Sequence, residues 1–409
     1  MASVAVRTET IRPWVTDKIF LGLPQRDYLR GLLTPFNVAA AAIMALGVPI
    51  IVYRFIYGLG AVSNLSQSSP WGLWIGLDMM SGVALAAGGY TIAGAVYVFG
   101  LERYRPIVRP AILTAFLGYV FAVIGLLVDL GRPWRIAYPI FYSAGPTSVM
   151  YEVGWCVAAY TTVLLLEFTP AAFEWLGLKG LRNRMVRLTV GLTVFGIVLS
   201  TLHQSSLGAL FLLTPTKLHP LWYSSFIPLY FFISSIAAGL SMVIIESRLS
   251  HRLFHHRVDP TKPVDLDGLT ISLSRAASVV LFTYFFLTLQ GLADSGDFIY
   301  LPTAYGAWYL VEIVGLALVP CFLFAHAART ANARLARWAA VLTVLGVVLN
   351  RLNVSIIAMN WQEAVRYVPT WMEIVTSITI ITAGVLTFRW IVNRMPILAP
   401  HPDYSQDAH

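Results

Sequence analysis

Residues 111–128 read AILTAFLGYVFAVIGLLV, an unbroken run without a single charged side chain. A helix of this length rises roughly 27 Å, close to the thickness of the hydrocarbon core of a bilayer. Arg109 and Pro110 precede the run and Asp129 follows it. The stretch therefore predicts a membrane-spanning helix, and the rest of the chain repeats the pattern.

Hydrophobic residues make up 57% of the 409 positions and charged residues only 12%. This composition leaves too little polar surface to cover a water-exposed globule of this size, and it excludes a disordered chain. We predict an all-α polytopic membrane protein of about ten transmembrane helices. The predicted spans are 33–57, 72–99, 108–130, 148–170, 188–213, 222–246, 268–292, 303–328, 333–355 and 369–393.

Lysine and arginine are unequally divided between the two sides of the membrane. Of the 28 basic residues, 21 fall on the side of the N-terminus, and Arg275 lies inside a span. The six on the opposite side are Arg54, Arg132, Arg135, Lys217, Arg351 and Arg366. Positive loops mark the cytoplasmic side, so both termini are predicted to be cytoplasmic, in a bacterial inner membrane. The net charge of +8 thus reflects topology and does not indicate nucleic-acid binding.

The chain divides into four parts. Residues 1–32 form a cytoplasmic or interfacial segment without the pattern of a cleavable signal, and residues 11–23 are expected to lie along the membrane surface. Residues 33–246 hold the first six spans, residues 247–395 the last four, and residues 396–409 a cytoplasmic tail. Because the connecting loops are short, any function is expected between the helices or at their ends. The predicted periplasmic end of each span is its outer end.

Cysteine and histidine usage limits the cofactors. Cys156 and Cys321 lie singly in apolar runs, which predicts neither an iron–sulfur cluster nor a disulfide. A haem held by two histidines needs both at one depth on facing helices. Only His203 and His326 fall in predicted spans, at opposite ends, so no haem is predicted. No metal site is predicted either, and electrons would have to come from a partner.

Ionisable residues within the spans concentrate in the outer half of the membrane. A charge near the centre of a span costs at least ~2.5–3.5 kcal/mol, so each one requires a partner, a wet cavity or a function. The outer-half residues are Asp78, Asp129, Glu152, His203, Glu312, Arg351 and Glu373. The inner half holds Glu167, Glu246, Arg275 and His326. The imbalance predicts a site on the outer side.

Small residues share a helix face with several of these groups. Asp78 is in register with Gly82, Ala86, Gly89 and Ala93, and Asp129 with Gly118, Ala122 and Gly125. Gln204 aligns with Gly196, Ser200 and Gly208, beside His203. Helices approach closely along such stripes, so these polar groups are expected to point into a bundle. Simpler interpretations stay open: Asp129 could pair with Arg132 at a helix end, Glu152 and Glu373 could be interfacial, and Glu167 and Glu246 could be solvated.

A carboxylate and an imidazole in one membrane pocket suit a quinone. The quinone ring enters from the bilayer, a histidine can donate to a carbonyl, and an acid such as Asp78 can relay the protons that reduction takes up. A secondary transporter, which would use the same charges for substrate and ions, is the alternative. No internal repeat supports the transporter. A passive anchor would not need His203 and Asp78 on packed faces.

Four segments together carry a family resemblance: Ser69-Pro70-Trp71-Gly72-Leu73-Trp74-Ile75-Gly76-Leu77-Asp78, Arg105-Pro106-Ile107-Val108-Arg109-Pro110, His203-Gln204-Ser205-Ser206-Leu207-Gly208 and His219-Pro220-Leu221-Trp222. Here the chain resembles the NrfD/PsrC polysulfide-reductase-type family of quinone-interacting membrane subunits, and most closely its HybB-like branch. The resemblance implies two four-helix bundles plus two extra helices, a menaquinone site near the periplasm, and no cofactor held within this subunit.

The resemblance also implies partners, because such a subunit is not an enzyme alone. These are a periplasmic four-cluster ferredoxin-like iron–sulfur subunit, fed by a hydrogenase or by a multihaem cytochrome c with a molybdopterin-type subunit, in anaerobic respiration. By position, Asp78 and His203 would be the catalytic pair. The expected quinone-binding residues are Asp78, His203, Gln204, Ser205, Glu152, Asp129, Arg132 and Trp71, with Arg351 as a support. Glu167, Glu246 and His326 are a hypothetical proton path from the cytoplasm.

Overall fold

The computed structural model describes residues 16–142, 145–260, 263–399 and 404. Ten spans of helix in this part of the chain are long and apolar enough to cross a membrane, which confirms the predicted all-α polytopic class. They are α3 (Pro35–Tyr57); η2 (Trp74–Ser81) with α4 (Gly82–Leu85) and α5 (Gly88–Tyr97); α6 (Arg105–Asp129); α8 (Val149–Leu176); α9 (Lys179–Ala209); α10 (Ile227–Leu253); α11 (Leu266–Ser295); α12 (Ala304–Leu310) with η8 (Val311–Leu318) and α13 (Val319–Thr330); α14 (Ala333–Leu352) with η9 (Asn353–Ile357); and α15 (Trp371–Val392).

Helices α8 and α9 extend well past the predicted spans at their inner ends. Residues 171–187, expected as a loop, are helical except around Gly177 and Leu178. Gly177 adopts a left-handed conformation with φ of 75°, which ends α8. The predicted spans are shorter because the length of an apolar run reflects only the hydrocarbon core of the bilayer, whereas these two helices continue beyond their apolar runs.

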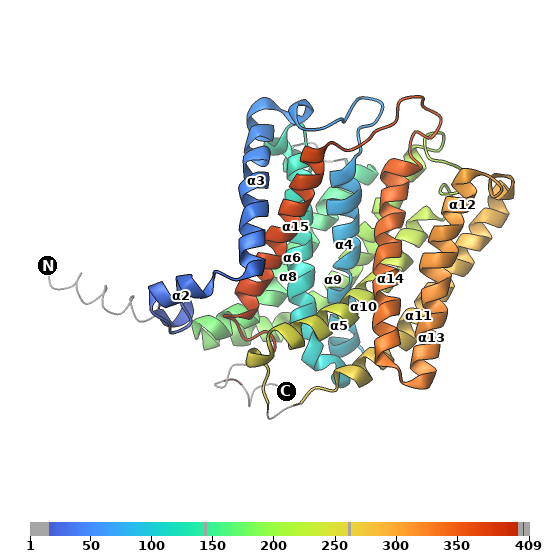
Figure 1. Cartoon of the computed structure of the whole chain (residues 1–409). Coiled ribbons are helices and arrows are strands. Elements are labelled where there is room, and N and C mark those ends of the chain that lie inside the picture. The colour runs from blue at the N-terminus through green and yellow to red at the C-terminus, as the bar shows by residue number, and fades with distance from the viewer. Residues whose placement is uncertain (1–15, 143–144, 261–262, 400–403, 405–409) are drawn as a thin grey trace.

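The ten spans form two bundles and a separate pair (Figure 1). The first bundle contains η2–α5, α6, α8 and α9, and the second contains α10, α11, α12–α13 and α14. The remaining two, α3 and α15, pack on each other, and α15 also contacts α6. This is the architecture that the family resemblance implied. The sixth span, α10, belongs to the second bundle and also contacts the first. The boundary between the two bundles therefore lies before α10, whereas the predicted boundary between the two halves of the chain lies at residue 246.

The small-residue stripes of the second and third spans pack against each other. A Cβ built on Gly118 would lie 2.9 Å from the Cβ of Ala86, and one on Gly89 would lie 2.4 Å from the Cβ of Ala115. One on Gly125 would lie 2.7 Å from the Cβ of Asp78. The prediction that Asp78 points into a bundle along a close helix contact is therefore confirmed.

The two bundles meet at a second close approach. A Cβ on Gly239 of α10 would lie 2.4 Å from the backbone nitrogen of Gly88 in α5. A Cβ on Gly88 would in turn lie 2.8 Å from the carbonyl oxygen of Gly239. Only glycine permits such contact between two backbones, so this pair sets the distance between the bundles.

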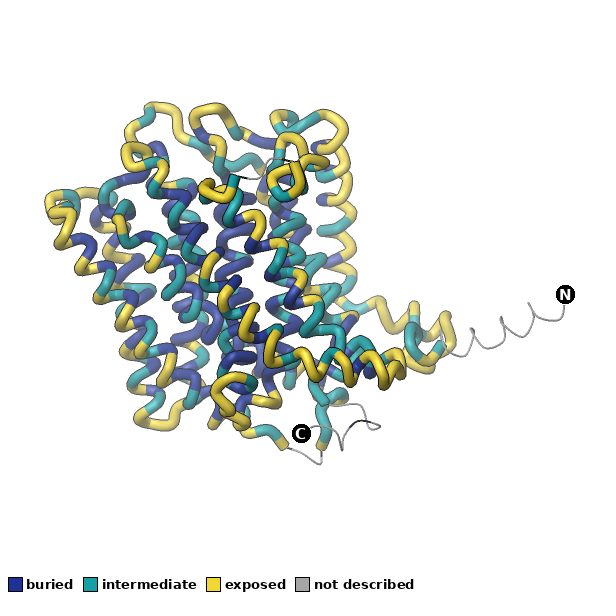
Figure 2. Tube along the Cα trace, turned by 180° about the vertical axis from the view of Figure 1, so that it is seen from behind, coloured by how far each residue is buried: buried dark blue, intermediate teal, exposed yellow. Residues whose placement is uncertain are grey.

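Exposed residues cover the perimeter while the interior is buried (Figure 2). Large apolar side chains such as Ile56, Val279 and Phe322 are more than half exposed, as expected of a multi-pass protein whose sides face lipid. The predicted surface segment 11–23 falls partly outside the described residues. Beyond it, α2 (Gln25–Gly31) lies at the inner end beside α3 and buries none of its residues.

Candidate functional site

Asp78 lies on a segment wound as a π-helix, η2, in the outer half of the first bundle. Its carboxylate is buried and accepts a hydrogen bond of 2.6 Å from the Ser377 hydroxyl of α15. The other oxygen, Oδ1, makes no hydrogen bond to any described residue. Single turns of π-helix are often found at functional sites, and an unpaired buried acceptor costs free energy. Asp78 thus presents a buried carboxylate oxygen without a hydrogen-bond donor, on a π-helical segment.

Asp129 ends α6 above Asp78, and its basic neighbour is Arg54 of α3. The Arg54 side chain is buried and donates to the carbonyl of Val128 at 2.6 Å and to that of Leu130. Its guanidinium also interacts electrostatically with Asp129. Arg132 is exposed, and no ion pair joins it to Asp129 within the described ranges. The alternative of an Asp129–Arg132 helix-end pair therefore does not describe this structure.

Glu373 is fully buried at the start of α15. Its side chain accepts from the Thr370 backbone N–H at 2.7 Å and from the Tyr367 hydroxyl, while the Thr370 hydroxyl caps the same helix. Glu373 is therefore a helix cap rather than an interfacial group. Burial raises the pKa of Tyr367, which lies outside the spans.

His203 is fully buried in α9 among aromatic rings. Its Nδ1 lies 2.8 Å from the carbonyl of Leu199, so Nδ1 carries the proton and Nε2 accepts from the hydroxyl of Tyr119. The ring of Tyr160 lies 5.5 Å from that of His203 and 4.8 Å from that of Tyr119. Both imidazole nitrogens are thus occupied within the protein.

Gln204 connects the same helix to the second span. Its Nε2 donates to the carbonyl of Val83 at 3.0 Å, and its Oε1 has no hydrogen-bond partner in the described part of the chain. The same is true of the Tyr160 and Ser200 hydroxyls. The outer half of the first bundle therefore holds several buried polar atoms whose hydrogen bonds are unmade.

Of the other predicted residues, Trp71 packs on the hydrophobic core that contains Tyr119 and Tyr160. Trp71 packs edge-on against Phe211, with ring centroids 5.4 Å apart, and Ser205 and Glu152 are half-buried. Within the described residues, no hydrogen bond joins Asp78 to His203. Asp78 contacts Gly125 of α6 and Ser377 of α15, whereas His203 bonds to Tyr119 of α6. The structure thus forms two adjoining polar groups, Asp78 with Asp129 and His203 with Gln204.

Sequence reasoning missed Tyr119, Tyr160, Arg54 and Ser377. Tyr119 directly follows Gly118 of the small-residue stripe. This neighbouring position could have indicated that its side chain lies close to the packed helix face. Arg54 enters the sequence argument only as one of the six basic residues on the outer side. Ser377 lies 299 residues away from its partner Asp78, and no sequence pattern connects the two. Tyrosine is common in membrane spans, so Tyr119 and Tyr160 do not stand out in the sequence.

Arg351 belongs to a different group, in the second bundle. Buried Glu312 of η8 accepts from Trp222 Nε1 at 2.8 Å, from Asn350 Nδ2 at 2.6 Å and from Asn353 Nδ2. Arg351 donates to Asn350 Oδ1 at 2.6 Å and has no contact with the His203 cluster in the described residues. Its expected role as a support for the quinone residues is therefore indirect.

The His219-Pro220-Leu221-Trp222 segment caps the outer end between the bundles. The His219 ring is buried against Tyr305 and Trp361, with centroids 4.5 and 4.6 Å away, and Nδ1 accepts from the Leu221 N–H at 3.2 Å. Burial lowers the pKa of His219 to about 4, against an opposing effect of Asp297. The ring is therefore neutral at physiological pH.

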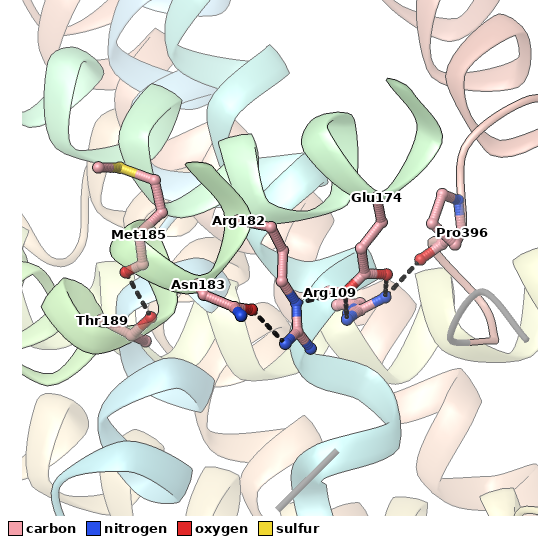
Figure 3. Close-up of polar contacts among 7 residues, drawn as sticks. All are labelled: Arg109, Glu174, Arg182, Asn183, Met185, Thr189 and Pro396. Carbon is pink, nitrogen blue, oxygen red and sulfur yellow. Dashed lines mark hydrogen bonds and ion pairs between the residues drawn. The ribbon is translucent and has the colours of Figure 1, made fainter. Parts of the chain in front are cut away.

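At the inner end, buried Glu174 and Arg182 and half-buried Arg109 form a clamp (Figure 3). Arg109 binds Glu174 through two hydrogen bonds of 2.8 and 2.9 Å and also donates to the carbonyl of Pro396. Arg182 joins Glu174 at 3.3 Å. The clamp ties α6, α8 and α9 to the segment after α15, which gives the family-like Arg109 a structural role.

The residues of the hypothetical proton path are separated. Glu246 is buried, accepts from the Ser250 hydroxyl at 2.6 Å and leaves Oε2 without a partner in the described chain. Glu167 accepts from the Thr193 hydroxyl at 2.7 Å. His326 is exposed on the side of α13. Of these three residues, Glu246 is the one that is buried with an unpaired carboxylate oxygen.

Residues 61–361 match the family model described as "Polysulphide reductase, NrfD", and the chain belongs to this family. A Nitratidesulfovibrio vulgaris protein is 53% identical over 382 residues, covering 93% of this chain and 98% of that protein. The Escherichia coli "Probable Ni/Fe-hydrogenase 2 b-type cytochrome subunit" is 32% identical over 88% of this chain and 91% of its own length. The N. vulgaris "Menaquinone reductase, integral membrane subunit" is 26% identical over 85% and 88%. The predicted family resemblance is confirmed.

Proposed function

We propose that the chain is the membrane subunit of a periplasm-facing respiratory oxidoreductase that exchanges electrons between an iron–sulfur partner subunit and menaquinone. In this proposal it lies in the bacterial inner membrane with both termini in the cytoplasm. The observation that carries it is the set of unpaired buried polar atoms around Asp78, His203 and Gln204, in family-like segments of an NrfD-family chain. Relatives named as hydrogenase and menaquinone reductase subunits support the class of complex.

The unpaired atoms fit the head group of a quinone. Asp78 Oδ1 and Gln204 Oε1 are acceptors without donors, which suits the two hydroxyls of a quinol. The Tyr160 hydroxyl is an unused donor, which suits a carbonyl. When bound, the quinone supplies two-electron, two-proton redox chemistry. The protein's part is to orient the ring, with Trp71 at the edge, and to move protons.

His203 would act through Tyr119. Its Nε2 accepts the Tyr119 hydroxyl, so the pair can pass a proton along an existing hydrogen bond while the Leu199 carbonyl holds the ring. Asp78 would accept or return the other proton, with Asp129 and Arg54 setting the local charge. Ser205, Glu152 and Arg132 remain proposed contributors at the rim.

The residues do not fit a haem. Both nitrogens of His203 are engaged in hydrogen bonds within the protein, so neither is free to bind iron. His326 is exposed at the other end of the membrane. The words "b-type cytochrome" belong to the E. coli relative and are not carried over to this chain.

A proton path from the cytoplasm would begin between α10 and the first bundle. Glu246 Oε2 and the Thr114 hydroxyl, both unpaired, line a cavity of about 10 Å³, room for about one water molecule. The buried hydroxyls of Tyr90, Ser200 and Tyr160 also have no hydrogen-bond partner in the described part of the chain, and the Tyr160 ring lies 5.5 Å from that of His203. We propose this column, with Glu246 at its inner end, as the route; exposed His326 does not fit it.

A partner would dock on the outer end. Trp134, Phe141 and Tyr142, in the segment around α7 (Tyr138–Phe141), are each more than two-thirds exposed on that side. Exposed aromatic residues next to a redox site suit a protein partner. The proposed partner is an iron–sulfur subunit, fed by a hydrogenase or a cytochrome c-linked enzyme.

The test is to purify the chain in mild detergent with whatever co-purifies, and to measure bound quinone and binding of a fluorescent hydroxyquinoline N-oxide analogue of menaquinol. We expect menaquinone with iron–sulfur or c-type haem absorbance from partners. His203→Ala should lose analogue binding, whereas the exposed His326→Ala should keep it. A lone protein without quinone or redox partner would instead favour the secondary transporter.

A further inference from the structure

A cavity in the second bundle is lined in part by Pro220, Leu221 and Trp222, and none of Asp78, His203 and Gln204 lines it. It holds about 30 Å³, room for roughly two water molecules, between α10, α11, α12 and the loop before α10. Ser295 is exposed at its outer mouth, and buried Glu312 lies at its base. The cavity therefore offers water a route from the outer face to a carboxylate inside the membrane.

A smaller cavity lies directly beneath. Its volume is about 10 Å³, and it shares Glu312, Asn350 and Tyr284 with the cavity above. The 2.6 Å bond between Glu312 and Asn350 thus lies at the partition between the two. The lower cavity ends on the apolar side chains of Leu281, Leu316 and Val347, so the route is open outward and closed inward.

The charge of Glu312 is balanced through an amide. Arg351 donates to Asn350 Oδ1, and Asn350 donates to Glu312, which makes a chain of guanidinium, amide and carboxylate. Arg351 is further held by the Ser234 hydroxyl at 2.9 Å and by the ring of Phe231, 3.6 Å from its guanidinium carbon. Among the described residues, Tyr284 on α11 and Tyr309 on α12 interact electrostatically with Glu312. Tyr230 on α10 and Tyr223 before it line the same cavity.

We propose that Glu312 is a second proton-exchange site, loaded and unloaded from the outer aqueous side through this cavity. A hydronium ion gives its proton to the carboxylate and leaves as water, and the reverse step returns the proton. Protonation removes one acceptor from the three N–H donors, so the Asn350 amide turns and its bond to Arg351 breaks. The Tyr309 hydroxyl lines the same cavity as Glu312 and would accept a hydrogen bond from the new carboxyl O–H. This site goes beyond the quinone site and does not rest on it.

The first experiment is an infrared titration of the full-length chain in lipid nanodiscs, perfused with buffers of falling pH. We expect a protonated-carboxyl band that shifts in D₂O and is lost in Glu312→Gln. Glu174→Gln, altered in a clamp that lines none of the cavities described, is the matched control and should keep the band. If Glu312→Gln shows the same band as the wild type, the proposal is overturned.

A second measurement does not depend on removing Glu312. Thr288 lines the outer cavity and Leu281 only the lower one. We expect silver ion, which is no larger than a water molecule, to label Thr288→Cys from the outer side and not Leu281→Cys, with the buried native Cys156 and Cys321 as background. Absence of labelling at Thr288→Cys would show that the cavity is dry and that Glu312 only holds the structure together, and it would overturn the proposal.

Discussion

Each bundle buries one carboxylate on a π-helical segment in its outer half, and the two are satisfied differently. Asp78 in η2 has one donor and an oxygen without a partner in the described residues. Glu312 in η8 has three N–H donors and a guanidinium one amide away. An acid in an apolar run therefore marks two kinds of site: an acceptor with an unused oxygen at Asp78, and a balanced charge beside a cavity at Glu312.

A third π-helical segment, η9, lies between the two. Asn353 at its start donates to Glu312, and Ser355 packs on η2, where a Cβ on Gly76 would lie 2.2 Å from the Ser355 hydroxyl oxygen. The π-helical geometry widens a helix and re-aims its side chains. The two carboxylates are thus held by one connected set of non-standard turns, and the difference between them can be tested by changing each separately.

The largest expected effect is on stability in the second bundle. Glu312→Ala leaves three N–H donors and Arg351 without their buried acceptor, which should cost about 3–5 kcal/mol of unfolding free energy. Asp78→Ala removes a single hydrogen bond and should cost about 1 kcal/mol. Thermal unfolding of both variants in the same detergent measures the contrast. Equal losses would mean that the two carboxylates are not satisfied as described.

The contact between the bundles should give the next largest effect. Gly239→Ala places a methyl group against the backbone of Gly88, so α10 must move away from α5. Such overpacking should cost about 1–3 kcal/mol. Gly191→Ala on α9, where a Cβ meets nothing within 4 Å, is the matched control and should be neutral. A tolerated Gly239→Ala would argue that the bundles are not fixed to each other at this point.

The ten spans and the packed face of Asp78 could be predicted because they depend on local pattern. Run length predicts a span, and a Gly82, Ala86 and Gly89 repeat predicts which face is packed. The π-helical turns could not be predicted, since no residue type specifies them. The hydrogen bonds within each site could not be predicted either. Ser377 and Tyr119 bond to Asp78 and His203 from helices that are far away in the sequence. Only the packing of these helices shows which acceptors are left without a donor.

Asp78→Asn should separate function from stability in the first bundle. The amide keeps the shape and can still accept from Ser377, so the unfolding free energy should change by no more than about 1 kcal/mol. The proposed proton step at Asp78 would be lost, so quinone-linked electron transfer by the assembled complex should fall sharply. Steady-state oxidation of a menaquinol analogue measures this. Full activity in Asp78→Asn would remove Asp78 from the proposed site.

The smallest expected effect concerns pH at the cap that covers both bundles. Because burial lowers the pKa of His219 to about 4, the native state stays neutral where an unfolded histidine, with a pKa of about 6.5, takes up a proton. The contribution of His219 to stability is therefore full above pH of about 6.5 and declines as the pH falls towards 4. The unfolding midpoint of the wild type should fall across this window more than that of His219→Gln. The drop should be modest, since Asp297 partly opposes the shift, and equal pH profiles would indicate that the ring is hydrated rather than enclosed by Tyr305 and Trp361.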